Sequence, residues 1–203
     1  MKKIFVFLLA GMLVNSVSMA GGDDKAKLAD KTLAVDTKNS TVVWGAKKVT
    51  GTHAGNVPIS SGSLILDGDK LKGGTFVLDM KNLTVTDVKD ADMNGKLTGH
   101  LKNADFFAVD AHPQAKFVIS TVTPKGAGAY DVTGKLTIKG ITSDVSFPAT
   151  VKSEGKKVLA DAKITVDRTK YDIKFRSSNF FENLGDKAIH NDFTLDVNLV
   201  ANK

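Results

Sequence analysis

The chain of 203 residues contains no cysteine, and only two of its basic residues are arginines, Arg168 and Arg176. Without cysteine it can form no disulfide, no thiolate nucleophile and no sulfur-ligated metal centre. Nucleic-acid-binding surfaces usually gather arginine and aromatic side chains on one face, whereas the basic residues here are mostly lysines scattered among acids. We therefore expect no nucleic-acid partner, and at most weak contact with a membrane surface.

Sequence motifs of common enzyme classes are also missing. The chain has no Gly-x-Ser-x-Gly motif, no P-loop and no Gly-x-Gly-x-x-Gly motif. Its four histidines form no His-x-His or His-x-x-x-His pair. We predict a protein that is not an enzyme, has no metal site and requires no cofactor. One alternative stays open, a metal held by His100, Asp105 and His112 after folding brings them together.

The N-terminal residues have the plan of a secretory signal peptide. Lys2 and Lys3 precede an apolar run at 4–14, and Ser18-Met19-Ala20 puts small residues at positions −3 and −1 of a cleavage site. The run is shorter than the ~20 residues that span a bilayer. We expect cleavage after Ala20 and a periplasmic or secreted protein. The expected organisation is a signal peptide (1–20), a flexible leader (21–38) and one domain (39–203).

From Thr41 onward apolar and polar residues alternate almost everywhere, the pattern of strands with one dry and one wet face. Glycine-containing turns separate the runs, and connections this short make neighbouring strands antiparallel. A helical spacing of apolar residues occurs between 90 and 110. We predict an all-β fold, an antiparallel β-barrel of about eight strands with one or two short helices. A two-sheet sandwich is the competing arrangement.

Five segments in order resemble the YceI-like family over about residues 40–202. They are Trp44 in the first strand, Leu97–Phe107, His112–Phe117, Val132–Thr142 and Asp167–Ile173. The resemblance implies an exported or periplasmic protein with a lipocalin-like barrel that binds a polyisoprenoid, such as an isoprenoid quinone or a prenyl pyrophosphate. Two features depart from the family pattern: Tyr171-Asp172 stands where many members have Phe-Gly, and 175–188 reads as an expanded loop.

The inward rows of the predicted barrel mix large and small side chains, which favours an open cavity over a solid core. Ala160 and Ala162 leave volume unfilled. The candidate cavity lining is Trp44, Phe76, Leu78, Met80, Phe106, Phe107, Phe117, Ile119, Val132, Leu136, Ile138, Phe147, Ala160, Ala162, Ile164 and Val166. Arg168 continues the row of Val166, so it is the candidate contact for a lipid head group. A structural pair with Asp167, Asp172 or another acid at the barrel end is the alternative for Arg168.

The sequence is compatible with two functions. The first is an exported binding protein, monomeric or homodimeric, that carries or stores an isoprenoid or other long-chain apolar lipid in the barrel. The second is a non-catalytic interaction protein with a filled core that binds a protein or glycan through the 175–188 loop.

Overall fold

The structure, a computed structural model, describes residues 29–203. The predicted signal peptide and the first part of the predicted leader lie outside the described residues, so both stay predictions. Within 29–203, no helix combines the length and the apolar character needed to cross a membrane.

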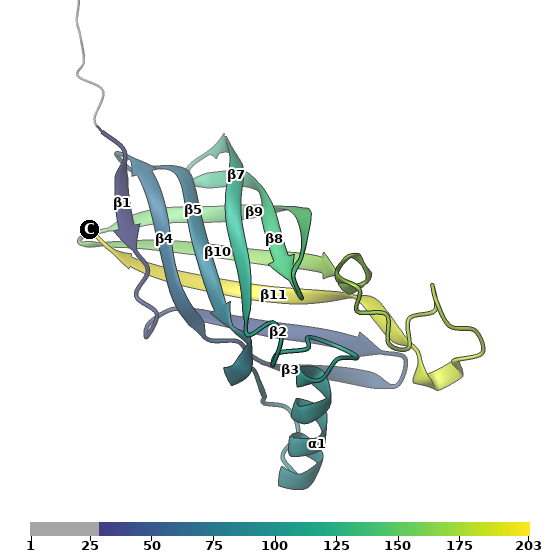
Figure 1. Cartoon of the computed structure of the whole chain (residues 1–203). Coiled ribbons are helices and arrows are strands. Elements are labelled where there is room, and N and C mark those ends of the chain that lie inside the picture. Colours follow the sequence, from purple (N-terminus) through teal and green to yellow (C-terminus); the bar gives the residue numbers. More distant parts are fainter. Residues whose placement is uncertain (1–28) are drawn as a thin grey trace, which may run out of the picture.

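Eleven antiparallel strands form one sheet, which confirms the all-β prediction and corrects the count of about eight. The strands are β1 (Lys31–Ala34), β2 (Thr41–Lys48), β3 (Gly51–Asn56), β4 (Ile59–Asp67), β5 (Lys70–Asp79), β6 (Thr84–Val85), β7 (Gln114–Gly126), β8 (Ala129–Ile138), β9 (Ile141–Glu154), β10 (Lys157–Asp167) and β11 (Ile189–Asn202). Their order across the sheet is β1-β4-β5-β7-β8-β9-β10-β11-β2-β3-β6. The sheet curls strongly, and a bridge between Val35 and Ala201 brings its β1 edge onto β11 (Figure 1). The architecture is therefore a strongly curled half-barrel.

Three short strands account for much of the difference from the predicted count. β1 lies inside the predicted flexible leader, and Leu33 is buried there opposite Leu64 of β4, so the folded domain begins before residue 39. β6 is only two residues long. β3 lacks apolar alternation, because Gly55 must lie directly against β6: a Cβ atom at this position would stand 1.8 Å from the carbonyl oxygen of Thr84.

Within residues 29–203, one α-helix and three 3₁₀ turns complete the fold. The predicted helical segment forms α1 (Ala91–Lys102), which begins where the Asp90 carboxylate accepts a hydrogen bond from the backbone N–H of Met93. The 3₁₀ turns are η1 (Met80–Asn82), η2 (Arg168–Tyr171) and η3 (Gly185–Lys187). No residue of α1 is fully buried, and Met93 is exposed. The helix therefore lies on the outside of the sheet and does not fill its core (Figure 1).

The core lies inside the curl, where the alternating rows of the strands meet. On β10 the buried residues Val158, Ala160, Ile164 and Val166 share one parity, and their neighbours between them are more exposed. The dry-face prediction is thus confirmed, and these inward rows supply the walls of the candidate site.

Candidate functional site

An apolar cavity of about 100 Å³ lies inside the curled sheet and is named here the main cavity. It collects side chains from strands across the whole curl, and only Lys116 and Asp161 among its lining residues are charged. Ten of the predicted lining residues contribute to it: Phe76, Leu78, Phe117, Ile119, Val132, Leu136, Phe147, Ala160, Ala162 and Ile164. The aromatic rings of Phe76, Phe117 and Phe147 lie in sequence along one wall, with ring centroids 6.5 and 5.5 Å apart.

A second apolar cavity of about 80 Å³, the end cavity, lies toward η1 and η2. Five further predicted residues line it, Trp44, Met80, Phe106, Phe107 and Ile138, together with the predicted head-group contact Arg168. Val166 is buried but lines neither cavity. Three leucines, Leu78, Leu136 and Leu195, belong to both linings. They form a partition that divides the interior into two chambers.

Several cavity residues were not among the sequence candidates. They are Val42, Ile59, Leu64, Leu71, Val145, Ala149, Val151, Leu195, Val197 and Leu199. Most continue alternating rows on β9 and β11, so the two-residue period was the signal that would have identified them.

The guanidinium of Arg168 is buried and held by backbone carbonyls instead of a carboxylate. Its Nε donates to the carbonyl of His190 at 3.0 Å, Nη1 to that of Ile173 at 2.7 Å and Nη2 to that of Ile189 at 3.0 Å. Burial lowers the pKa of Arg168, while nearby Asp167 opposes this change, and an arginine remains charged in either case. Arg168 thus ties η2 to the start of β11.

Among the described residues Arg168 forms no ion pair, so the alternative of a structural pair with Asp167, Asp172 or another acid at the barrel end is not seen in the structure. Asp167 accepts hydrogen bonds from the backbone N–H and the hydroxyl of Thr169, and Asp172 pairs with Lys174 at 2.7 Å. Three of the five guanidinium N–H donors are used, so the head-group role of Arg168 stays a prediction that rests on the other two.

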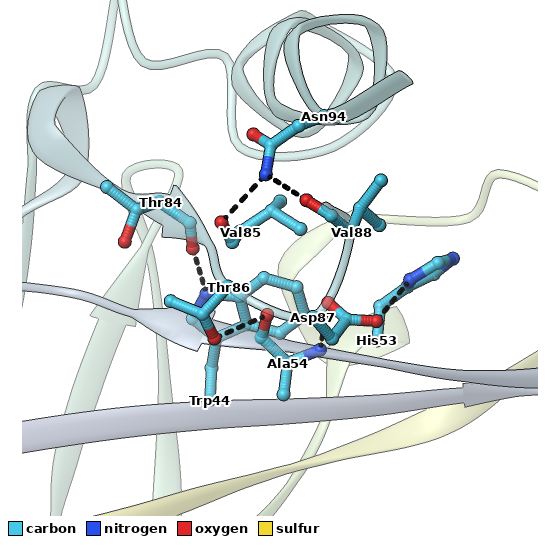
Figure 2. Close-up of polar contacts among 9 residues, drawn as sticks. All are labelled: Trp44, His53, Ala54, Thr84, Val85, Thr86, Asp87, Val88 and Asn94. Atoms are coloured by element: carbon cyan, nitrogen blue, oxygen red, sulfur yellow. Dashed lines mark hydrogen bonds and ion pairs between the residues drawn. The ribbon is translucent and has the colours of Figure 1, made fainter. Parts of the chain in front are cut away.

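Polar contacts fasten α1 and β6 to the β2–β3 hairpin beside the end cavity (Figure 2). The indole N–H of Trp44 donates to the carbonyl of Thr84 at 3.0 Å, and the Asn94 amide of α1 donates to the carbonyls of Val85 and Val88. The Asp87 carboxylate accepts the backbone N–H of Ala54 at 3.0 Å and lies 2.9 Å from the ring nitrogen of His53. This latch holds the segment between β6 and α1 in place.

Partial burial opposes ionisation of Asp87, but its hydrogen bonds outweigh this effect. The backbone N–H of Ala54 and the His53 ring both favour the carboxylate, so the pKa of Asp87 lies below its ordinary value. The Asp87 carboxylate of this latch is therefore ionised at neutral pH.

The 175–188 loop divides into a packed part and an exposed part. Phe175 packs against His100 and Phe106, with ring centroids 4.8 and 5.5 Å away. Phe180 and Phe181 are about half exposed and line neither cavity. Phe180 and Phe181 therefore cover neither cavity, whereas the buried Phe106 forms part of the wall of the end cavity.

Potential metal ligands do not gather in the described part of the chain, residues 29–203, where no group of three or more such side chains could hold an ion. The His100 ring pairs with Asp105 at 3.0 Å. His112 lies instead beside Gly140 at the β8–β9 turn.

The YceI-like domain family model matches residues 33–201. A UPF0312 protein of Photorhabdus laumondii is 31% identical over 137 residues, 64% of this chain and 70% of that protein. A UPF0312 protein of Pseudomonas putida strain W619 is 47% identical over 57 residues, so the match spans 28% of this chain and only 30% of that relative.

Solved structures show the same fold. Burkholderia cenocepacia BcnA superposes with a TM-score of 0.68 at 25% identity, covering 82% of this chain and 99% of BcnA. A polyisoprenoid-binding domain from Saccharophagus degradans gives a TM-score of 0.64 at 13% identity, covering 84% and 97%. With its fold, its apolar interior and a family match over nearly the whole described chain, this protein belongs to the YceI-like domain family.

Proposed function

We propose that this chain is an exported, non-catalytic carrier or reservoir that holds the tail of an isoprenoid or other long-chain apolar lipid inside the curled sheet. The observation that carries the proposal is the main cavity, whose lining is apolar except for two side chains. The structural likeness to a domain described as polyisoprenoid-binding supports the same ligand class.

The volume of the interior agrees with a tail of moderate length. A water-sized group needs ~10–15 Å³ of such space, so the main cavity holds about seven to ten groups, each close to a methylene in size, and the end cavity beyond the leucine partition holds about five to eight. Burial of hydrocarbon is worth ~0.8 kcal/mol per methylene, so a tail segment of seven to ten carbons in the main cavity gains about 6 to 8 kcal/mol before ordering costs. Tight binding then needs few polar contacts.

Native mass spectrometry of the protein, expressed with its own signal peptide and purified without detergent, tests this proposal. We expect an added mass that organic extraction identifies as a prenyl or acyl lipid. The double variant A160F/A162F should lose this mass because both side chains would fill the main cavity. The matched control Thr165→Phe, on the exposed face of the same strand, should keep it. An unliganded mass, with no uptake of added quinones, prenyl phosphates or fatty acids, would refute the carrier.

One observation favours a second function. Phe180 and Phe181 present large apolar side chains to solvent in the 175–188 loop, and exposed aromatic groups are typical of contact surfaces. If the carrier test fails, recognition of a protein or glycan by this loop becomes the leading function, and the double variant F180S/F181S should abolish it.

A further inference from the structure

The pairing between β9 and β10 is incomplete. The two strands pair from Lys157↔Glu154 to Ala162↔Ala149, and no pairing continues beyond that point. β9 nevertheless stays paired with β8 as far as Ile141, and β10 stays paired with β11 as far as Asp167. The sheet therefore splits between residues 141–148 of β9 and 163–167 of β10.

The split begins at Pro148, the residue that would pair next with Lys163. Proline has no backbone N–H, so within a sheet it can occupy only a position whose N–H is not needed for a hydrogen bond to the neighbouring strand. On β9 the backbone N–H of Val151 donates to the carbonyl of Gly128 beside β8, and successive N–H groups of a strand point to alternate sides, so the missing donor of Pro148 faces β10. The sequence itself thus ends the ladder at this position.

The main cavity and an outer groove share wall residues at the start of the split. The outer groove, of about 510 Å³, runs over β7 to β11, and Ala149, Asp161, Ala162 and Val197 line both this groove and the main cavity. Along β9 the inward residue Val151 is buried, whereas Val145, Phe147 and Ala149 beside the split are only half-buried. Apolar cavity wall is therefore in contact with solvent at the split.

Each end of the curled sheet carries contacts that connect segments across it. At one end the β4–β5 turn crosses over: Asp69 accepts a hydrogen bond from the Ser153 hydroxyl at 2.6 Å and pairs with Lys203 at 3.0 Å. At the other end the Lys139 ammonium donates to the carbonyls of Ala104 and Asp172.

No ion pair among the described residues closes the split in the same way. Lys135 pairs with Asp144 on the β8–β9 side, and Lys163 pairs with Asp196 on the β10–β11 side. Toward the Ile141 end of the split, η2 packs against β9, and the buried Tyr171 lies beside Ser143 and Asp144, so the open part of the split is at residues 145–148 of β9. The opening is bounded at both of its ends.

We propose that the β9–β10 split is a lateral portal through which a lipid tail enters the main cavity, leaving its head group in the outer groove. This inference rests on the proposed function and adds the chemical class of the head.

The charged residues of the groove are Lys125, Asp131, Asp161, Lys163 and Asp196, three acids against two lysines. Both lysines are paired within the groove, with Asp131 at 2.6 Å and Asp196 at 3.2 Å. An anionic head finds no free cation there, so the portal selects a neutral head such as an alcohol or a quinone.

Cross-linking across the split tests the portal. Because the chain contains no cysteine, the double variant S146C/T165C places two unique thiols on the exposed faces of β9 and β10, on opposite sides of the opening. A bis-maleimide linker with a reducible spacer then lies across the split. The control K152C/L159C carries the same linker over a position where the strands are already paired.

Stopped-flow uptake of all-trans-retinol, a neutral isoprenoid alcohol whose fluorescence rises in apolar surroundings, gives the rate. We expect uptake to slow about tenfold or more in cross-linked S146C/T165C, to recover when the spacer is reduced, and to be unchanged in the control. Equal rates with and without the linker would overturn the portal while leaving binding, and hence the proposed function, intact.

Comparison with retinoic acid, which has the same skeleton and an anionic head, tests the head-group class. Retinol should bind more tightly, and tighter binding of the acid would overturn the placement of the head in the outer groove. If farnesol fails to displace retinol, or neither retinol nor farnesol binds the protein before cross-linking, the proposed function itself fails.

Discussion

Replacement of Ala160 by leucine should weaken binding of a prenyl ligand without weakening the fold. Ala160 is buried on β10 and lines the main cavity but not the outer groove. Leucine adds three carbon atoms, which would occupy the space of about three of the seven to ten water-sized groups that the main cavity holds.

The lost burial sets the size of the effect. Three methylene-sized groups at ~0.8 kcal/mol each amount to about 2.4 kcal/mol, or about a 60-fold increase in Kd for a ligand that fills the main cavity. Ala160→Val adds two carbons and should cost about 1.6 kcal/mol, or about 15-fold. Because the new atoms enter an existing hole, the free energy of unfolding should stay constant or rise.

Isothermal titration with farnesol, paired with urea unfolding of each variant, checks the prediction. Thr165→Leu, which adds carbon atoms on the exposed face of the same strand, should bind as the unsubstituted protein does. If the valine and leucine variants are as stable as the parent chain and bind farnesol equally well, the tail does not occupy the main cavity and the reasoning is refuted.

Three further predictions concern the supports of the cavity. Arg168→Met removes hydrogen bonds to three backbone carbonyls. Because hydrogen bonds of a charged group are worth ~1.5–3 kcal/mol each, the free energy of unfolding in urea should fall by about 3 kcal/mol or more. A smaller decrease would show that water replaces the guanidinium. Folding lowers the pKa of Asp87. The stabilising effect of its ionised carboxylate is therefore complete above the unfolded-state pKa and is lost as the pH falls through the lower folded-state pKa. The urea midpoint of Asp87→Asn should thus fall less between about pH 4 and pH 2 than that of the parent, and parallel curves would contradict this assignment. The buried Tyr171 hydroxyl lies near the Ser143 side chain but has no partner in full hydrogen-bond geometry, and burial raises its pKa to about 12. Tyr171→Phe should be at least as stable as the parent in thermal unfolding, because it removes a polar group that is not fully satisfied. A clear drop in Tm would show that the hydroxyl bonds to Ser143 in solution.

Much of this architecture could be predicted from the sequence because the alternation of apolar and polar residues along a strand is a local pattern. The rows on β8, β10 and β11 report their buried face through spacing alone, and the helical spacing of Leu97 and Leu101 identified α1. β1 and β3 escaped detection because neither shows an apolar row: β1 is four residues long, and Gly55 is small in order to admit β6.

The candidate site was harder to predict because its decisive contacts are distant in the chain. The partition between the cavities forms only after three strands have assembled and brought together Leu78, Leu136 and Leu195, so it cannot be predicted from residue spacing. The partners of Arg168 were hidden for another reason. Every residue carries a carbonyl, and only the tertiary fold determines that those of Ile173, Ile189 and His190 converge on one side chain.

The bridge between Val35 and Ala201 has a consequence for the order of folding. It joins residues from near the two ends of the domain, and β11 also pairs with β2, so the sheet cannot curl shut before the last strand is available. Closure of such long loops makes folding slow compared with hairpin formation. While the chain is being synthesised, the β4–β5 and β7–β8 hairpins can form, but the cavity cannot. A chain that gains its interior only once β11 is available suits the export that we propose, because it stays without a closed cavity until then and would bind its first ligand after translocation.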